Sequence, residues 1–442
     1  MKAPLTLSLC LLSLSAAAQR REPLCAVVDS RRVLSAPHMA VNGSDRLVAQ
    51  RFLSPGAGPS TLVAVRDPER SLRIAGRPRG PRALSTLEWS GPHRNTGNAA
   101  PGLVVVRLDD HLDRVGEAMF IEDPIQEPRG HEETFAPGIP VGVPIDDGVM
   151  LFEHIGGDLY GVLVGPEGQP GPLRRLAEAP REDGHGGFTW ITAAPRRRDG
   201  QQGAVVLAGT AAGEVMALGV DAHGAPIGHA ALWGQRVGGT MQLFEGPEGA
   251  QPVALLERPV RGTTLHGEQA REQVLVRLRD TLEPNGTPER VGLGPYETAG
   301  VLRDNQLVLT QWAEMRGLAV STVGLDPSRL AIETPHIWTT QPLDGIALGH
   351  RLVLGPDNIA YDFVLNGDTT AGGLHGYLTY LPRAGTPFAR RELLPLRARV
   401  IARPELLASE DGVVVFMATY DELGGGVDAV HLRCDMVTLP ER

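Results

Sequence analysis

Several residue types are scarce in this chain. It has 442 residues, of which three are cysteines, only Lys2 is a lysine, and 5% are aromatic. The sequence contains no Cys-x-x-Cys pair, His-Glu-x-x-His motif, Walker loop, dinucleotide fingerprint or Gly-x-Ser-x-Gly elbow. The motif-defined zinc sites, nucleotide sites and hydrolase nucleophiles are therefore absent, and whether the protein is an enzyme stays open at this point.

Positive charge is also outnumbered. Lysine and arginine total 42 against 52 aspartates and glutamates, which gives a formal net charge of −10. Nucleic acids and anionic membranes are bound through basic patches, so we expect neither as a partner. Beyond the N-terminal segment, no apolar run reaches the ~20 residues of a spanning helix, so we expect no transmembrane segment after signal removal.

The N-terminus has the pattern of a secretory signal peptide. Lys2 precedes an apolar run from Leu5 to Leu14, and the small residues Ser15 to Ala18 follow. A basic start, a short apolar stretch and small residues before a polar break are typical of such peptides. We expect residues 1–18 to be removed and a single mature domain, residues 19–442, to be secreted or periplasmic.

A repeated strand–turn pattern dominates the mature chain. Glycine (54) and proline (36) are abundant, which indicates many tight turns. Alternating apolar strands run into turns of Asp, Gly or Pro, as Val215 to Val220 does before Asp221 to Pro226. Further copies begin at Leu62, Leu103, Leu159, Val274, Ala319, Gly376 and Ala429. The roughly 40- to 60-residue spacing is that of four-stranded propeller blades.

A second, more continuously apolar strand precedes most copies. Examples are Val205 to Ala208, Leu307 to Thr310 and Val413 to Phe416. Strands covered on both faces by neighbouring sheets have this composition. Only Leu173 to Ala179 has a helical pattern. The sequence therefore predicts an all-β propeller of seven to eight four-stranded antiparallel blades, and the motif count favours eight.

Two β-sandwich domains are the alternative fold, because they also have short strands and regular turns. A two-domain chain should contain a linker of low-complexity Pro, Ser or charged residues. No such stretch divides this chain, and the repeat continues across its middle.

Closure of the ring is predicted from the two chain ends. Cys25 and Cys434 are the cysteines that survive signal cleavage, and exported proteins commonly oxidise paired thiols. The last repeat, Ala429 to Leu432, has little chain left for an outer strand, whereas Leu24 to Val28 has no partner strand near it in sequence. We expect Leu24 to Val28 to complete the last blade and Cys25 to bond Cys434.

The repeats between Leu62 and Leu432, together with this closure, resemble secreted bacterial β-propeller proteins. The resemblance implies an architecture and carries over no catalytic residue. The segment Asp183 to Trp190 resembles half of the Asp-box turn of sialidase-like propellers, with the Gly-x-Thr-Trp end in place. His185 stands where that turn has aspartate.

Candidate ligand-binding residues come from the loops after the second strand of each blade. In a propeller these loops usually open on the ligand-binding face, and here they are rich in glycine and acids. The candidates are Asp158, Glu214, Glu314, Asp362, Asp368 and Asp421. A ring of carboxylates there could bind Ca²⁺, which prefers several hard oxygens. Exposed turns also favour Asp and Gly for conformational reasons alone.

Two functions remain open from the sequence. An exported, non-enzymatic propeller would bind a polysaccharide, peptide or protein at one face. A propeller-type glycan hydrolase or lyase would instead use carboxylates and histidines that meet only in the fold. Paired carboxylates ~5 to 9.5 Å apart would favour a hydrolase. A purely structural surface protein would have no concave polar site.

Overall fold

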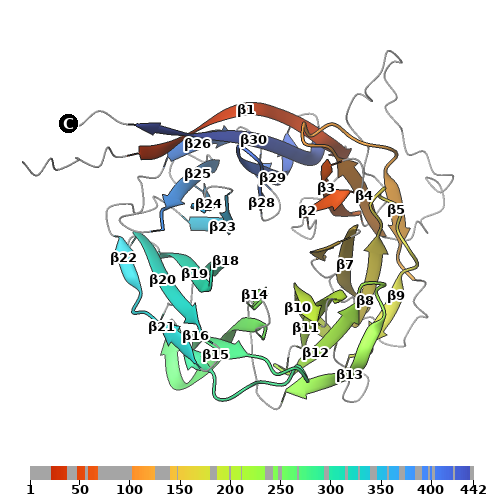
Figure 1. The fold of residues 1–442 in the computed structure, drawn as a ribbon, viewed down its shortest axis with the longest axis vertical. Helices are drawn as coiled ribbons and strands as arrows, with labels where there is room; N and C mark the ends of the chain where they lie inside the picture. Colours follow the sequence, from red (N-terminus) through yellow and green to blue (C-terminus); the bar gives the residue numbers. More distant parts are fainter. Residues whose placement is uncertain are drawn as a thin grey trace, which may run out of the picture.

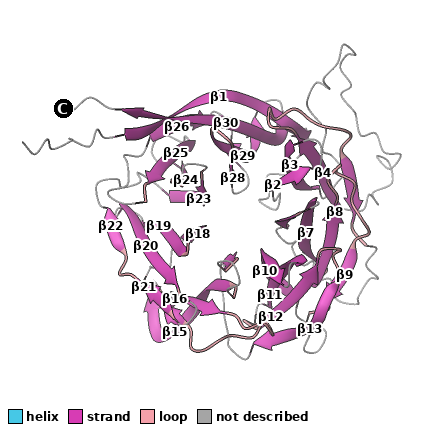
Figure 2. Cartoon of the chain, viewed as in Figure 1, coloured by secondary structure: helices cyan, strands magenta, loops and turns pink. Residues whose placement is uncertain are grey.

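The computed structural model describes residues 21–36, 47–54, 58–67, 102–124, 140–146, 148–179, 187–198, 201–210, 212–233, 242–246, 251–265, 268–292, 298–313, 317–326, 329–338, 346–355, 358–367, 374–383, 391–396, 399–400, 404–421 and 424–438. These residues form seven antiparallel sheets, and none of them lies in a helix. Figures 1 and 2 show the sheets arranged around a central axis as the blades of one ring. The predicted all-β propeller is confirmed.

The strands of each blade follow one another outward from the centre, and we name them A to D (Figure 1). Blade 1 contains β2 (Leu47–Ser54), β3 (Gly58–Asp67), β4 (Gly102–Leu108) and β5 (Met119–Glu122). Blade 2 contains β6 (Val141–Ile145), β7 (Gly148–Ile155), β8 (Asp158–Val164) and β9 (Arg174–Ala177). Blade 3 contains β10 (Phe188–Arg198), β11 (Gln201–Thr210), β12 (Val215–Asp221) and β13 (Pro226–Trp233).

The remaining blades repeat this order. Blade 4 contains β14 (Gln242–Phe244), β15 (Val253–Leu265), β16 (Glu268–Arg277) and β17 (Glu289–Arg290). Blade 5 contains β18 (Thr298–Arg303), β19 (Gln306–Ala313), β20 (Gly317–Leu325) and two outer segments, β21 (Leu330–Ile332) and β22 (His336–Trp338). Blade 6 contains β23 (Ile346–Leu354), β24 (Ala360–Gly367), β25 (Leu374–Leu381) and β26 (Arg391–Leu396).

Blade 7 joins the two ends of the chain. Its strands are β27 (Arg399–Val400) with β28 (Glu405–Ala408), β29 (Gly412–Asp421), β30 (Gly424–Thr438) and, outermost, β1 (Arg21–Ala36). Strand β1 pairs antiparallel with β30, and this register places Cys25 opposite Cys434. The two cysteines form a disulfide across 409 residues of sequence, which confirms the predicted closure. Disulfides are typical of proteins in oxidising compartments.

The ring has seven blades, not the eight favoured by the motif count. The copies that begin at Leu62 and Leu103 are neighbouring strands, β3 and β4, of the same blade. In the sequence they have the spacing of separate repeats, because residues 68–101, which lie outside the described part of the chain, stand between them. The other copies are each the third strand of their own blade.

Seven apolar clusters hold the ring together, one between each pair of neighbouring blades. Residues alternate between them: in β11, Val205 and Leu207 pack toward blade 4, and Ala204 and Val206 toward blade 2. Both faces of the second and third strands are thus buried, which explains their continuous apolar sequence. Because the clusters run around the whole ring, the two-sandwich alternative is wrong.

The loops between the strands lie on two opposite faces of the ring. The turns from strand A to B and from C to D lie on one face of the ring, which we call the A–B face. The connections from strand B to C lie on the other, the B–C face.

Arginines link neighbouring blades through backbone carbonyl groups, mainly on the A–B face. Arg196 donates to the carbonyl of Asp280 (3.1 Å), and Arg303 donates to that of Leu381 (3.1 Å). Three similar contacts join Arg51 to Ala408, Arg107 to Pro166 and Arg277 to Arg329. A guanidinium stays charged and presents several donors, which suits it to this role.

The predicted helix at Leu173 to Ala179 is wrong. Residues Arg174–Ala177 form β9, the outer strand of blade 2, since pairing with β8 outweighs a weak local preference. No described helix is long and apolar enough to cross a membrane. The proposed signal peptide, residues 1–18, lies outside the described residues.

Candidate functional site on the B–C face

Buried polar side chains gather near the B–C face in every blade. Most lie toward the end of strand B, where the strand leads into strand C. Glu257 lies in the first half of the longer β15, on the B–C side of the residues that pair with β14. This polar belt consists of Arg66, Glu153, His154, Thr210, Glu257, Gln311, Asn366 and Thr419. The first residues of strand B, on the opposite face, are mostly apolar, with Ser60 and Thr61 of blade 1 and Asp362 of blade 6 as exceptions. The interior of the ring is therefore more polar toward the B–C face.

The most highly charged part of the belt lies between blades 1 and 2. Arg66, near the end of β3, donates from Nη1 to Asp123 Oδ1 (3.3 Å) and to Glu153 Oε1, and from Nη2 to Asp123 Oδ2. All three side chains are buried. One guanidinium thus bridges two carboxylates from different blades. Breaking a buried charge pair of this kind is strongly destabilising.

The electrostatic balance of this cluster shifts one of its carboxyl groups. Burial raises the pKa of Asp123 above its usual value, although the charge and hydrogen bonds of Arg66 act in the opposite direction. Asp123 follows β5 and belongs to the connection toward blade 2. The cluster therefore holds a carboxyl group that takes up a proton more readily than an exposed aspartate.

A second polar network lies between blades 5 and 6. Asp362 on β24 accepts a hydrogen bond from Trp312 Nε1 (2.9 Å) and contacts His350 Nε2 (2.8 Å). His350 Nε2 also lies 3.1 Å from the Thr310 hydroxyl. All four side chains are buried. Because the carboxylate is fully desolvated, these polar contacts are what make its burial tolerable.

A third group is uncharged and joins blades 4 and 5. The Thr298 hydroxyl donates to Gln273 Oε1 (2.7 Å) and accepts from Gln311 Nε2 (3.2 Å). Gln242 donates to the Thr298 carbonyl at 2.6 Å. Hydrogen-bonded side chains thus extend the belt across this junction.

The predicted ligand-binding acids have different environments. Asp158 is buried at the start of β8, 3.7 Å from Arg175 Nη1, and accepts a bond from the Ala179 amide (3.3 Å). Glu214 is exposed in the B–C connection of blade 3. Asp362 lies inside β24, not in the loop after it, and belongs to the buried network above.

The remaining candidates are less fully defined. The backbone of Asp421 ends β29 on the B–C face. Glu314 and Asp368 lie outside the described residues. Among the described residues, no group of three or more His, Cys, Asp or Glu side chains is arranged to hold a metal ion. Ca²⁺ binding and the carboxylate ring stay predictions.

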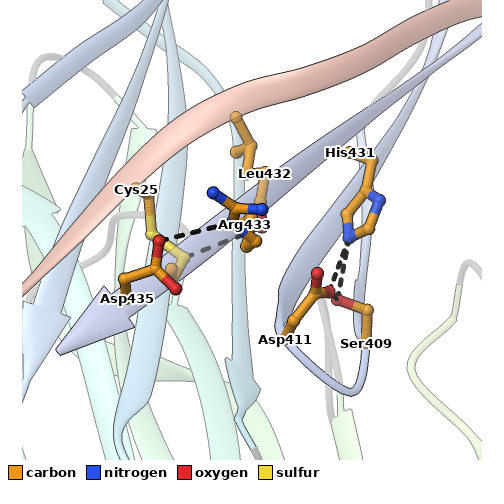
Figure 3. Close-up of a disulfide and its surroundings, with 8 residues drawn as sticks. Cys25, Ser409, Asp411, His431, Leu432, Arg433 and Asp435 are labelled. Carbon is orange, nitrogen blue, oxygen red and sulfur yellow. Dashed lines mark hydrogen bonds and ion pairs between the residues drawn. A yellow bond between two sulfur atoms is a disulfide. The ribbon is translucent and has the colours of Figure 1, made fainter.

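Ser409, Asp411 and His431 form a cluster on the opposite, A–B face of blade 7 (Figure 3). His431 Nε2 lies 2.9 Å from Asp411 Oδ1 and 3.2 Å from Ser409 Oγ. In a catalytic triad, the carboxylate and the serine contact different ring nitrogens. Here both contact the same nitrogen, so the cluster lacks the geometry that would relay a proton from the serine.

The charged cluster and the buried network were not found from the sequence. Asp362 interrupts the apolar run Ile359 to Leu365, and Arg66 and Glu153 end similar runs. Ionisable residues in strands that are buried on both faces need polar partners. An ionisable residue within an apolar run therefore predicts a buried polar contact at that position. The partners themselves are distant in sequence, which hides them from motif searches.

Comparison with known proteins supports no assignment beyond the fold. No protein-family model and no curated protein matches the chain. A similar solved structure is the β-propeller domain of the Trilobed protease from Pyrococcus furiosus, with 8% identity and a TM-score of 0.46, covering 89% of this chain and 97% of that one.

Two further structures have similar extent. A protein of unknown function from Dyadobacter fermentans has 12% identity and a TM-score of 0.44, covering 92% of this chain and 100% of that one. The WD40 domain of SCAP from fission yeast has 11% identity and a TM-score of 0.42, covering 94% and 90%. At these values the similarity says nothing about ligand or activity.

Proposed function

We propose that this protein is an exported, non-enzymatic propeller that binds a polysaccharide, peptide or protein on its B–C face. The observation that supports the proposal is the polar belt, because all seven blades bring buried polar side chains to this one face. Ligand sites combine such groups with the loops of a rigid scaffold. The Cys25–Cys434 disulfide supports a secreted or periplasmic location.

Blocking each face in turn tests the proposal. Glu214 is exposed on the B–C face, and Glu117 is exposed in the C–D connection of blade 1 on the A–B face. Each is replaced by cysteine and coupled to a polyethylene glycol maleimide. We expect the polymer at position 214 to prevent binding to polysaccharide and peptide arrays, and the polymer at position 117 to leave binding intact. Equal loss from both faces would contradict the proposal.

A glycan hydrolase or lyase is the second candidate, and the Arg66–Asp123–Glu153 cluster favours it. Two carboxylates bonded to one guanidinium lie close together, and Asp123 has the raised pKa of a general acid. Both carboxylates are bonded to Arg66, whose charge and hydrogen bond oppose protonation of Asp123, and this makes catalysis the weaker candidate. Release of reducing sugar by the wild type, and its loss in Asp123→Asn with retained folding, would establish catalysis.

A further inference from the structure

The junction between blades 5 and 6 differs from the other six. Among the described residues, its apolar cluster contains six buried members, whereas every other junction has eleven or more. The Thr310–Trp312–His350–Asp362 network occupies part of the space that apolar side chains fill elsewhere. Farther from the ring axis, aromatic and imidazole rings line the two blades.

The first pair of rings belongs to blade 5. Strand β22 pairs with β20 on the outer edge of this blade, and its register places Trp338 opposite Leu318 and His336 opposite Val320. Directly opposed residues of antiparallel strands project from the same face of the sheet. Leu318 belongs to the cluster shared with blade 6, so His336 and Trp338 face blade 6 as well. Their ring centroids lie 4.3 Å apart.

The second pair belongs to blade 6 and lies on the face of that blade toward blade 5. The register of β24 and β25 places Tyr377 opposite Val364 and His375 opposite Asn366. Val364 is a member of the same cluster, and Tyr377 packs against it. His375 and Tyr377 therefore face blade 5, with their rings stacked 6.1 Å apart.

Both pairs lie toward the B–C face. Trp338 is the last residue of β22, which runs toward this face. His375 is near the start of β25, which begins at this face. In Figure 1, β22 lies on the side of blade 5 that is nearer blade 6. His336 is exposed and the other three rings are partly exposed. We call these four residues the aromatic walls.

We propose that the aromatic walls bind a sugar unit of a neutral polysaccharide. This rests on the proposed function and names its ligand. The C–H faces of a sugar ring complement the electron-rich faces of aromatic rings. The imidazole nitrogens of His336 and His375 can donate to or accept from sugar hydroxyl groups.

The chemistry of the walls favours a neutral sugar over a charged polymer. None of the four side chains is a carboxylate or a guanidinium, which would recognise the charges of a peptide. The net charge of −10 disfavours an acidic glycan. A neutral polysaccharide is therefore the occupant that these side chains fit.

Calorimetric titration tests the proposal by measuring the affinity of the protein for neutral hexasaccharides. The ligands are the hexasaccharides of cellulose, xylan, laminarin and chitin. The variants are Trp338→Ala and His375→Ala, one from each wall. Ile337→Ala is the matched control, because Ile337 lies on the same strand, is 47% exposed and is paired with Ala319 on the sheet face toward blade 4. Circular dichroism and thermal unfolding verify that each variant folds, and Trp338→Phe should retain part of the affinity.

We expect at least one hexasaccharide to bind the wild type, each wall variant to weaken it by about tenfold or more, and Ile337→Ala to change it by less than about twofold. Unchanged affinity in both wall variants would contradict the assignment of the sugar site to the aromatic walls but would leave the proposed function intact. Binding of a peptide and of no hexasaccharide would likewise contradict the sugar site and leave the proposed function intact. Failure of the wild type to bind any of the hexasaccharides would overturn the sugar site, and failure to bind any saccharide, peptide or protein would remove the proposed function as well.

Discussion

Cys25 and Cys434 are bonded to each other although 409 residues separate them in the sequence. The bond joins two strands that are already paired from Arg21 opposite Thr438 to Ala36 opposite Gly425. Arg32 adds a bidentate contact to Asp428 within the same blade, at 2.9 and 3.3 Å. The seam of the ring is thus held by hydrogen bonds, an ion pair and a covalent bond.

Removal of the disulfide should destabilise the ring without preventing its formation. For a Cys25→Ser/Cys434→Ser variant, we expect a loss of roughly 2–5 kcal/mol in the free energy of unfolding, because the open chain gains entropy when it unfolds. Urea unfolding followed by circular dichroism measures the change. A reductant should destabilise the wild type by a similar amount and leave the variant unaffected. Equal sensitivity of both proteins to reductant would refute this role.

Loss of the buried carboxylate between blades 5 and 6 should be among the most damaging single changes. Asp362→Ala leaves the Trp312 indole N–H without its acceptor and removes one polar contact of His350, which keeps its contact with Thr310, and we expect a loss of about 3 kcal/mol. Exposed Glu117→Ala should change stability by no more than about 0.5 kcal/mol. Thermal unfolding compares the two variants. A loss in Asp362→Ala as small as in the control would show that the network does not hold the blades together.

Gly209 illustrates a close approach that permits no side chain. A Cβ atom at this position would lie 1.7 Å from Cζ2 of Trp190, whose ring packs against the cluster between blades 3 and 4. Gly209→Ala must displace the indole, and we expect destabilisation of about 1–3 kcal/mol. Gly165→Ala is the control, because the nearest atom to its Cβ would be 3.7 Å away. Thermal unfolding and tryptophan emission should change in the first variant only.

The Asp411–His431 contact should make stability depend on acid pH. Partial burial opposes ionisation of Asp411, but the hydrogen bond and charge of His431 and the hydrogen bond of Ser409 outweigh it and lower the pKa of this carboxyl. Because the folded pKa is the lower one, the carboxylate stabilises the fold above the unfolded value of ~3.9, and this contribution is lost as pH falls through the folded value.

Asp411→Asn should therefore reduce stability at pH 7 and progressively less as the pH falls below about 4. The side chain is 47% exposed, so solvent screening limits the effect at neutral pH to about 1 kcal/mol or less. Urea unfolding between neutral and acid pH compares the variant with the wild type. A stability difference that is constant over this range would contradict the assignment.

The sequence predicted those parts of the fold that depend on local pattern. Strands such as β11, β12 and β29 are apolar on successive or alternate residues because their faces are buried between blades. The closure was also predictable, since Cys25 and Cys434 lie at opposite ends of the mature chain. Inner strands such as β14 and β28 were missed, because they are short and partly exposed and carry no clear period.

The blade count and the site could not be obtained in the same way. Residues 68–101 separate β3 from β4, so neighbouring strands of one blade were counted as two repeats. Asp362 meets Trp312 and His350 across 50 and 12 residues of sequence, and only the ring brings them together. Long-range pairing of this kind leaves no local signal except an ionisable residue in an apolar strand.

Backbone amide hydrogen exchange tests most directly whether the ligand binds on the B–C face. Exchange rates are compared between the free protein and the protein saturated with the hexasaccharide that binds it most tightly. The account predicts slower exchange in β22 and at the start of β25, where the aromatic walls lie. The turns on the A–B face, including 109–113 and 221–225, should be unaffected. Protection confined to those turns, with none in β22 or β25, would contradict it.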